Sequence, residues 1–551
     1  MSRETIADLL LDQVGDVRPG LKTRQRTYRW DDVVTESAAR AELGRALRTE
    51  GPFHIGVLLD NVPEFLFWLG GAALAGATVV GINPTRRGAA LEQEIANTDC
   101  QLIVTDRKGL SLLDGLDVGV DRERFLLVDG PGYAELLARH TATPTRDGTV
   151  SRSTRMLLLL TSGTTGVSKA AICSQGRLAG LGYQNSAKYG VGPEDVCYCP
   201  MPLFHGNALM ALWAPALAAG ACVALPPKFS ASGFLDDVRF FGATFFTYVG
   251  KAIGYILAQP ESPDDAGNPL THAFGTEASP EDQATFLRRF GCRLYEGYGS
   301  SEGAGMLELA ENAPTGSLGV PAKASVKIVN PETRTVCPPA VLDGHGHVRN
   351  AEESIGEIVD TEGAAKFEGY YRNEAANAER VRYGWYWTGD LGYVDREGYF
   401  YFAGRSGDWI RVDGENISAL LTERVLRRHQ QVLAAAVFAV PDPRSGDQVM
   451  AALEIPEGTP FDALRLPEFL AAQDDLGTKG APRFVRVSHA LPTTGSGKLR
   501  KKEMQSQGWR TEDAVYRWVG RGDVAYMPMT EGARAELREE FVAGGRLRFL
   551  P

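Results

Sequence analysis

The first feature of the sequence that could do chemistry is a loop of glycine, serine and threonine. Residues 161–169 read TSGTTGVSK and follow the apolar run that ends at Leu160. Glycines let the backbone approach phosphate oxygens and turn N–H groups toward them, while Ser and Thr hydroxyls add donors. An ordinary polar turn has a similar composition. However, the residues TSGTTG would arise by chance on the order of 10⁻⁷ per position from average composition. We therefore predict a phosphate-binding loop.

The spacing of this loop differs from that of the phosphate loop of kinases and GTPases. Their pattern needs a glycine, four residues of any type, and then Gly-Lys followed by Ser or Thr. Gly163, Gly166 and Lys169 do not match it. Gly497-Lys498 does not match either, because Pro492 stands where the first glycine should be. Kinase and GTPase functions are thereby excluded.

The elements that position this loop alternate between apolar runs and longer amphipathic stretches. Examples of the apolar runs are residues 54–59, 78–82, 100–106, 124–128, 156–161, 222–226 and 243–249. This alternation predicts an α/β fold with largely parallel sheets flanked by helices. The uncharged stretch 65–82 has the minimum length of a membrane span. It is rich in Gly and Ala and then changes to β-branched residues, so we interpret it as a buried helix running into a strand.

The pattern changes beyond about residue 310. Short strands separated by turn residues predict a small β-rich subdomain, and mixed α and β segments return after Arg405. We predict a large N-terminal domain at residues 1–404 that contains the phosphate-binding loop. A small, mobile α+β C-terminal domain at residues 405–551 is expected to follow it.

Composition and cysteine usage argue against several classes of protein and of site. The chain is 44% hydrophobic and 23% charged, as in ordinary globular proteins. Its net charge of −11 argues against a nucleic-acid partner. Seven scattered cysteines without a Cys-x-x-Cys pair argue against a zinc site and suit free thiols in a reducing compartment. We predict a cytoplasmic protein without a transmembrane span, and leave peripheral membrane contact and a homodimer open.

Several motifs resemble those of the adenylate-forming superfamily, which includes acyl-CoA synthetases, peptide-synthetase adenylation domains and luciferases. After the loop come YGSSE (298–302), WYWTGDLGYV (385–394), GRSGDWIRVDGENIS (404–418) and TTGSGKLRKKEM (493–504), in the order that this superfamily has. The resemblance covers residues 156–504. The third of these motifs and ATFFTYVGKAIGYIL (243–257) are similar to the fatty-acid-transport-protein and very-long-chain acyl-CoA synthetase branch.

The resemblance implies an ATP-dependent acid–thiol ligase. A carboxylate would attack the α-phosphate of ATP and expel pyrophosphate, and coenzyme A would then take the acyl group and release AMP. The first step brings anions together, so it needs cations and N–H donors where charge accumulates. ATP, Mg²⁺ and coenzyme A are the implied cofactor and co-substrates. The branch implies a long-chain or bulky apolar acid, such as a fatty acid or a sterol side-chain acid.

Matching positions imply roles for individual residues. The domain at residues 1–404 would bind ATP and the acyl group, and the domain at residues 405–551 would carry the catalytic lysine. Lys498, Glu302 and His205 would be catalytic, with Lys498 stabilising the charge of the adenylation transition state. Glu302 and Thr161 would bind Mg²⁺, and Asp390 and Arg405 would hold the ribose. The other implied ATP contacts are Ser162, Gly163, Thr164, Thr165, Gly166, Lys169, Gly275, Thr276, Gly297, Tyr298, Gly299 and Ser301.

For three of these residues, a purely structural role is the alternative to the functional one. Lys169 could be an exposed loop lysine, Tyr298 a core aromatic residue instead of one that lies along the adenine, and His205 a buried histidine with satisfied hydrogen bonds. By analogy, Tyr248 and Gly250 are expected to line the acyl pocket.

The predicted hinge departs from the superfamily pattern. Gly407 stands where many relatives have Asp or Lys. Because glycine tolerates large changes of φ and ψ, we expect Gly407 and Asp408 to form the pivot between the adenylation and thioester-forming arrangements.

Two further functions compete with the acyl-CoA synthetase. One is an acyl-AMP ligase that passes its acyl group to a carrier protein. The other is a nonenzymatic lipid-binding or uptake protein, against which the presence of Glu302, Asp390, Arg405 and Lys498 argues.

Overall fold

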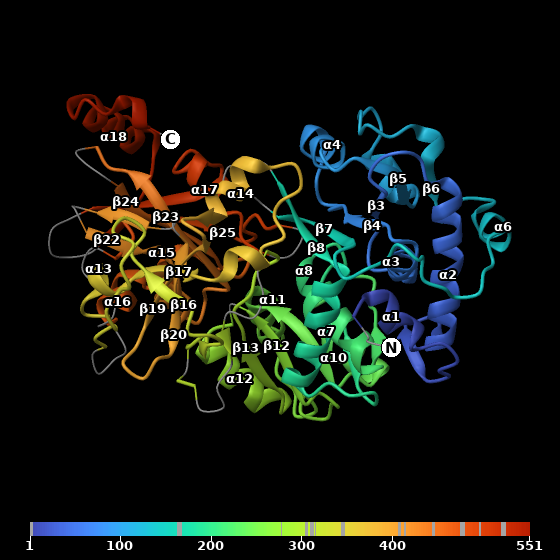
Figure 1. Ribbon diagram of the computed structural model, residues 1–551. Coiled ribbons are helices and arrows are strands. Elements are labelled where there is room, and N and C mark those ends of the chain that lie inside the picture. Colours follow the sequence, from blue (N-terminus) through green and yellow to red (C-terminus); the bar gives the residue numbers. More distant parts are fainter. Residues whose placement is uncertain are drawn as a thin grey trace. The chain divides into compact units, whose positions relative to one another are not determined.

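The structure is a computed structural model (Figure 1). It describes residues 4–161, 168–276, 278–302, 307–308, 313–314, 316–342, 348–405, 409–412, 415–443, 447–473, 476, 480–494, 498–519 and 525–550. The chain forms two compact units: residues 1–278, 283–305 and 364–382 make the first, and residues 279–282, 306–363 and 383–551 make the second. This division by contacts does not follow the predicted boundary between residues 404 and 405. The mobile C-terminal domain therefore stays a prediction.

The first sheet of the first unit carries the strand that leads into the glycine-rich loop. Its order is β6-β5-β3-β4-β7-β8, and β7 and β8 are its one antiparallel pair. Every residue of β3, β4 and β5 is buried, which explains their nearly continuous apolar sequences. The strands are His54–Leu58 (β3), Thr78–Gly81 (β4), Cys100–Thr105 (β5), Phe125–Leu127 (β6), Arg155–Thr161 (β7) and Lys169–Ser174 (β8).

The second sheet of the first unit has the order β13-β12-β11-β9-β10-β1-β2. Neighbouring strands of this sheet are parallel, except that β1 and β2 pair with each other in antiparallel fashion. They span Pro19–Lys22 (β1), Thr27–Arg29 (β2), Val196–Tyr198 (β9), Cys222–Ala224 (β10), Phe245–Val249 (β11), His272–Thr276 (β12) and Arg293–Glu296 (β13). The predicted α/β architecture with largely parallel sheets is confirmed.

Helices pack on these sheets in layers, as the blue to green part of Figure 1 shows. The largest core cluster joins residues of both sheets with residues of α2, α3, α7 and α9. In β11, Phe245 and Val249 face this cluster, whereas Phe246 and Tyr248 face a second cluster with α10 and α12. The helices discussed below are α2 (Trp30–Leu47), α3 (Pro63–Ala75), α7 (Gln175–Tyr189), α8 (Gly206–Ala208), α9 (Ala214–Ala219), α10 (Phe234–Phe241), α11 (Gly250–Leu257), α12 (Pro280–Phe290) and α14 (Glu374–Arg380).

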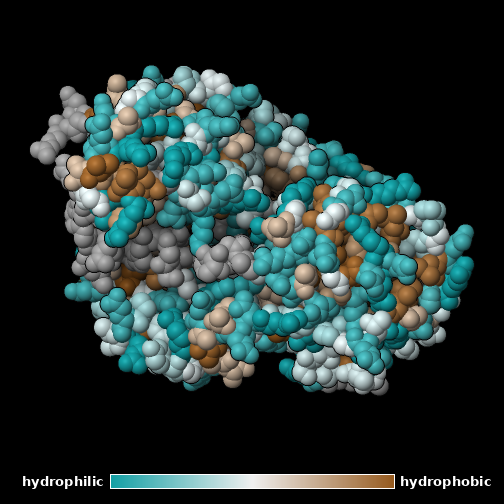
Figure 2. Space-filling view, turned by 90° about the horizontal axis from the view of Figure 1, so that it is seen from above, coloured by the Kyte–Doolittle hydropathy of each residue, from teal (hydrophilic) through white to brown (hydrophobic). Residues whose placement is uncertain are grey.

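The uncharged stretch 65–82 is a buried helix running into a strand, as predicted. Proline at its first position begins α3, and Gly76 ends it in the left-handed conformation with φ of 69°. Strand β4 follows directly. Within the described residues, no helix has both the length and the apolar character needed to cross a bilayer. The face drawn in Figure 2 is mainly hydrophilic, with separate hydrophobic areas.

The second unit is richer in strands, as predicted for residues beyond 310. Strands β16, β17, β19 and β20 are joined as antiparallel neighbours. A second sheet has the order β23-β24-β25-β26-β27, in which β24 and β25 are parallel. The bounds are Val326–Val329 (β16), Gly356–Asp360 (β17), Trp385–Val394 (β19), Phe400–Arg405 (β20), Trp409–Val412 (β21), Glu415–Ser418 (β22), Ala434–Pro441 (β23), Asp447–Glu454 (β24), Phe484–Ser488 (β25), Ala514–Val519 (β26) and Ala525–Pro528 (β27).

Helices α15 (Ala419–Arg427), α16 (Leu466–Ala471), α17 (Lys501–Gln507) and α18 (Glu531–Ala543) accompany the second sheet of this unit. Two core clusters hold its strands, one around Val437 and Val485 and one around Phe438 and Phe541. Alternate residues of β23 therefore face different clusters, as the two-residue period of a strand requires.

Candidate active site

The glycine-rich loop connects two antiparallel strands of the first unit. Strands β7 and β8 pair up to Thr161 and Lys169, and the Thr161 hydroxyl donates to the Lys169 carbonyl at 3.3 Å. This bond uses the hydroxyl proton, so the lone pairs of the Thr161 oxygen stay available for a cation. The predicted phosphate contacts Ser162, Gly163, Thr164, Thr165 and Gly166 lie outside the described residues.

Lys169 is buried at the start of β8, with 8% of its surface exposed. Its ammonium group pairs with Glu379 at 3.1 Å and lies 5.4 Å from the centre of the Tyr370 ring. The alternative of an exposed loop lysine is therefore wrong. The phosphate contact of Lys169 stays a prediction, and the ion pair with Glu379 joins α14 to the start of β8.

Glu302, the predicted metal ligand, accepts a hydrogen bond from Tyr370, which in turn accepts one from Arg380. The Tyr370 hydroxyl donates to Glu302 Oε1 at 2.8 Å, and Arg380 Nε donates to the Tyr370 oxygen at 3.1 Å. Nearby, Arg177 donates to the Ser301 carbonyl at 2.8 Å and to the Ile172 carbonyl of β8 at 3.0 Å. The YGSSE motif and the strand that leaves the loop are thus tied together.

This arrangement fits a magnesium ion that is held mainly by its substrate. In the part of the chain that is described, no three His, Cys, Asp or Glu side chains gather as metal ligands. Proteins commonly bind Mg²⁺ through one or two carboxylates together with substrate phosphates. Glu302 and the Thr161 oxygen, the two predicted ligands, would form such a limited donor set.

The predicted adenine and acyl residues lie at one edge of the second sheet. Strands β11, β12 and β13 are parallel, so their carboxyl ends meet at the same edge, where open α/β sheets bind ligands. Gly250 follows β11, Thr276 ends β12, and Gly297 follows β13. Tyr298 is half-buried, and Gly299 is exposed. The fold therefore brings these residues together.

Two of the predicted glycines are required for packing. A Cβ atom on Gly275 would lie 2.4 Å from Tyr248 Cδ2, and one on Gly297 would lie 2.2 Å from Phe274 Cε2. Both distances are far below an ordinary contact. An aromatic ring from the preceding strand therefore occupies the space beside each glycine that a side chain would need.

Tyr248 packs in the core beneath this edge. Its hydroxyl donates to Glu296 Oε1 at 2.8 Å and to the Tyr295 carbonyl at 3.1 Å, and the residue is 1% exposed. Burial and the neighbouring Glu296 carboxylate raise the pKa of Tyr248 well above its ordinary value. These contacts argue for a role in fixing the end of β13 and against the predicted role in lining the acyl pocket.

His205 begins the short helix α8, and its Nδ1 accepts a hydrogen bond from the Asn207 backbone at 3.3 Å. The next residue, Gly206, lies against the YGSSE motif, because a Cβ atom there would be 3.1 Å from Ser301 Oγ. The fold thus places His205 one residue from a contact with the nucleotide motif. Its catalytic role stays a prediction.

In the second unit, a bulge in β19 presents Asp390. Between the pairs Glu357–Leu391 and Val359–Trp387, Ile358 alone faces Thr388, Gly389 and Asp390. Gly389 has φ of 73°, and its N–H donates to Glu357 at 2.6 Å. Bulges of this kind re-aim side chains next to active sites. The bulge therefore explains why Thr-Gly-Asp occurs inside a strand.

The other predicted residues of the second unit lie on β20 and near α17. Arg405 is the register partner of Asp390 in the β19–β20 pair. Lys498 is half-buried, and its backbone exchanges hydrogen bonds with Thr494 at 2.7 and 3.1 Å. These two bonds fix the backbone of Lys498. Gly407 and Asp408, the predicted hinge, lie outside the described residues.

Comparison with known proteins agrees with these features. The family model of AMP-binding enzymes matches residues 23–371, and the model of the AMP-binding enzyme C-terminal domain matches residues 421–498. The chain is 64% identical over 551 residues to the steroid-22-oyl-CoA synthetase of Rhodococcus jostii, covering 100% of this chain and 99% of that protein. It is 43% identical over 513 residues to the medium/long-chain-fatty-acid–CoA ligase FadD17 of Mycobacterium tuberculosis, covering 93% of this chain and 98% of that protein.

Solved structures share the fold at lower identity. The anthranilate CoA ligase AuaEII in complex with anthranoyl-AMP superposes with a TM-score of 0.78 at 20% identity, covering 91% of this chain and 96% of that one. The fold and motifs define an adenylate-forming enzyme with a large N-terminal and a small C-terminal domain. The chain belongs to the AMP-binding enzyme family, and it acts as an AMP-forming acid–thiol ligase that uses ATP and coenzyme A.

Proposed function

We propose that this protein converts a steroid side-chain carboxylic acid into its coenzyme A thioester through an acyl adenylate. The observation that carries the proposal is the 64% identity, over the full length of both chains, to a steroid-22-oyl-CoA synthetase. Relatives at 42–43% identity are named for medium- and long-chain fatty acids, so an apolar acid is common to both groups. Transfer to coenzyme A is preferred over transfer to a carrier protein because all of these relatives are named as CoA ligases or synthetases.

In the first half-reaction, a carboxylate oxygen bonds to the α-phosphorus of ATP while the bond to the β-phosphate oxygen breaks and pyrophosphate leaves. Mg²⁺ would neutralise phosphate charge when bound, and Glu302 and Thr161 are the residues that would hold it. Asp390 accepts hydrogen bonds from the ribose hydroxyls, with Arg405 at the same sugar. Tyr298, Gly275 and Thr276 hold the adenine side, while the loop from Thr161 to Lys169 donates N–H and O–H groups to the phosphates.

In the second half-reaction, the sulfur of coenzyme A bonds to the acyl carbon, and the bond from this carbon to the AMP oxygen breaks. The thiol loses its proton, and AMP leaves. Lys498 acts only in the first half-reaction, where its ammonium stabilises charge at the α-phosphate. His205 and Gly250 are assigned to the acyl site. Rotation at Gly407 and Asp408 converts the adenylation arrangement into the thioester-forming arrangement.

The substrate is tested with a panel of acids. AMP release is measured with ATP, Mg²⁺ and coenzyme A, using a steroid acid with a three-carbon side chain, a steroid acid with a longer side chain, palmitate, octanoate and anthranilate. The proposal predicts the highest kcat/KM for a steroid acid. A higher kcat/KM for palmitate than for either steroid acid would make the protein a fatty-acid ligase.

The role of Lys498 is tested by separating the half-reactions. Lys498→Ala is expected to abolish acyl-adenylate formation while much of thioester formation from supplied adenylate remains. Equal loss of both steps would contradict this assignment. We also propose a cytoplasmic location, a homodimer and a peripheral membrane contact. Sedimentation of the pure protein tests the homodimer, and flotation with vesicles tests the membrane contact.

A further inference from the structure

Tyr370 lies where the strand that leaves the phosphate loop meets the metal-binding motif. Residues 369–371 run beside β8: Ile172 N–H donates to the Gly369 carbonyl at 3.0 Å, and Tyr371 N–H donates to the Ala170 carbonyl at 2.8 Å. Tyr370 itself bridges to Ala171. The backbone of Tyr370 is thus fixed to the strand that begins at Lys169.

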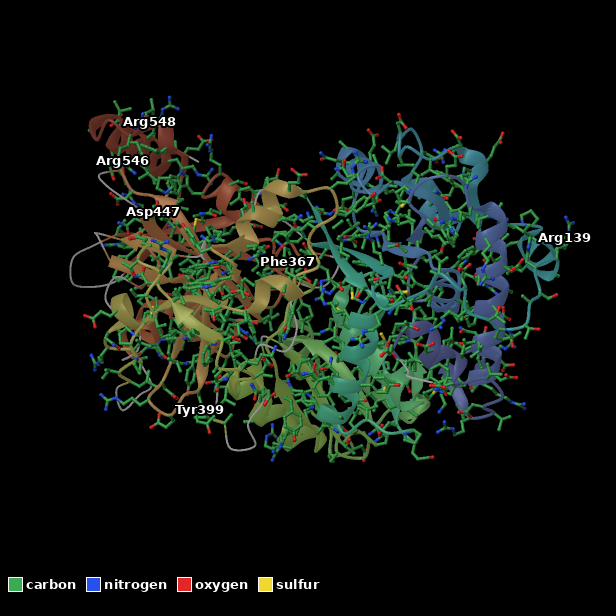
Figure 3. The ribbon with its side chains drawn as sticks, viewed as in Figure 1. Arg139, Phe367, Tyr399, Asp447, Arg546 and Arg548 are labelled. Atoms are coloured by element: carbon green, nitrogen blue, oxygen red, sulfur yellow. The ribbon has the colours of Figure 1, made fainter. Side chains whose placement is uncertain are left out.

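The side chain of Tyr370 is held in one place. Only 2% of the residue is exposed. The ring of Phe367, labelled in Figure 3, packs edge-on against its ring with 5.5 Å between centroids. The Asn377 side-chain amide accepts from the Tyr370 N–H at 2.6 Å and donates to its carbonyl at 3.2 Å. A phenol confined in this way has little freedom in where it directs its hydroxyl.

The Tyr370 hydroxyl connects the guanidinium group of Arg380 to the carboxylate of Glu302. Arg380 Nε donates to the phenol oxygen at 3.1 Å, and the phenol donates to Glu302 Oε1 at 2.8 Å. The phenol is the donor in the second of these bonds, because a carboxylate oxygen can only accept. A hydrogen bond from a hydroxyl to a carboxylate is of the strong, charge-assisted kind.

We propose that Tyr370 is a positioning residue for the divalent cation of the adenylation site, which it serves by orienting the carboxylate of Glu302. Because the Tyr370 hydroxyl occupies Oε1 of Glu302, Oε2 is the oxygen that would face a metal ion. Arg380 fixes the phenol by donating to its oxygen. Mg²⁺ demands near-ideal octahedral geometry, so the direction of a single carboxylate matters. Residues that orient metal ligands typically change metal affinity by about 10- to 100-fold when they are mutated. This inference rests on the proposed function, because it assigns Glu302 to the metal of that reaction.

The adjacent tyrosine provides a matched control. The Tyr371 hydroxyl also donates to a carboxylate, Asp99 Oδ2, at 2.6 Å. Asp99 is paired with Arg372 at 2.7 Å and is assigned no role in ATP or metal binding. Tyr370→Phe and Tyr371→Phe therefore each remove one hydroxyl from the same segment, but only the first removes a bond to Glu302. The ring contacts of both residues are kept.

The experiment measures metal dependence in two ways on wild type and both variants. The first is acid-dependent ATP–pyrophosphate exchange as a function of free Mg²⁺. The second is Mn²⁺ binding to enzyme with ATP and without acid, followed by electron paramagnetic resonance. Tyr370→Phe is expected to raise the Mg²⁺ concentration for half-maximal exchange, and the Kd for Mn²⁺, by about 10- to 100-fold. Its exchange rate at saturating Mg²⁺ should approach that of wild type, and Tyr371→Phe should stay within about twofold of wild type in both measurements.

The inference is overturned if both variants have the same Mg²⁺ and Mn²⁺ dependence, or if Tyr370→Phe lowers exchange at every Mg²⁺ concentration with unchanged Mn²⁺ binding. If Tyr370→Phe does not fold, Arg380→Gln takes its place, since it keeps the ring and must also weaken Mn²⁺ binding; unchanged binding refutes the inference. Failure of the proposed function is seen separately, as wild-type enzyme without acid-dependent exchange. The Mn²⁺ measurement still tests Tyr370 in that case.

Discussion

Gly297→Ala is expected to damage the nucleotide edge of the second sheet. The added Cβ atom would lie 2.2 and 2.3 Å from Cε2 and Cζ of Phe274, whereas an ordinary contact is 3.4–4 Å. The Phe274 ring cannot move aside freely. It stacks on Tyr189 with 4.3 Å between centroids, and its backbone is paired with both β11 and β13.

The overlap of more than 1 Å sets the size of the effect. Overpacking a well-filled site costs about 1–3 kcal/mol, and we expect the upper part of this range. Residues 298–302 follow Gly297 directly, so relief of the clash by backbone movement displaces Tyr298 and Glu302. Displacement of reacting groups by 1 Å costs about 100-fold in rate. We therefore expect kcat/KM for ATP to fall by about this factor.

Urea denaturation measures the stability change, and ATP–pyrophosphate exchange measures the activity. Gly299→Ala is the matched control for stability, because nothing lies within 4 Å of a Cβ atom built there. Phe274→Leu in the Gly297→Ala background should recover part of the lost stability, which makes the two changes non-additive. Wild-type stability of Gly297→Ala, or strict additivity in the double variant, would refute this reasoning.

Three further predictions concern buried groups. Burial and the nearby Arg155 lower the pKa of His54 below its ordinary value of 6.5, against an opposing hydrogen bond to the Thr98 carbonyl. The unfolded chain then binds the proton more readily, so stability should fall as the pH drops below about 6.5 and His54→Gln should lose this slope in urea titrations at several pH values. Arg289→Met leaves the carboxylate of Asp265 buried without its partner and should cost about 3–5 kcal/mol in urea denaturation. Arg288→Met breaks an exposed pair with Glu261 and should change the stability much less. The seven cysteines are all buried, so a thiol reagent at pH 8 should label none of them in the native protein and all of them in denaturant.

Each of these predictions has a result that contradicts it. A His54→Gln variant with the same pH slope as wild type would exclude this histidine as its origin. Equal losses for the two arginine variants would show that the Arg289–Asp265 pair is no more important than a surface pair. Labelling of any native cysteine would contradict the buried positions of the thiols.

The sequence predicted those strands that are buried on both faces. The apolar runs at 54–59, 78–82 and 100–106 are strands β3, β4 and β5 within two residues at each end. Strand β12 was missed because His272–Thr276 contains a histidine and a glycine and alternates in burial. Strand β9 was missed because it has only three residues. Short or half-buried strands give too weak a local signal for this kind of prediction.

The motifs predicted which residues belong to the site, but not which contacts hold them. Tyr370 was missed because its hydrogen bond to Glu302 joins residues 68 positions apart. Tyr248 was assigned to the acyl pocket, although it faces the cluster with α10 and α12. Both faces of a parallel strand are apolar, so the sequence of β11 does not indicate which face borders a ligand.

The central claim is attack of a carboxylate on the α-phosphate, and an oxygen label tests it most directly. The protein is incubated with ATP, Mg²⁺, coenzyme A and a steroid acid whose carboxyl group carries ¹⁸O. The masses of AMP and of inorganic phosphate are then measured by mass spectrometry. An acyl adenylate that is cleaved at its acyl carbon leaves one labelled oxygen on AMP, and this is the predicted result. Label in inorganic phosphate with formation of ADP would contradict the account, because the carboxylate would then have attacked the γ-phosphate.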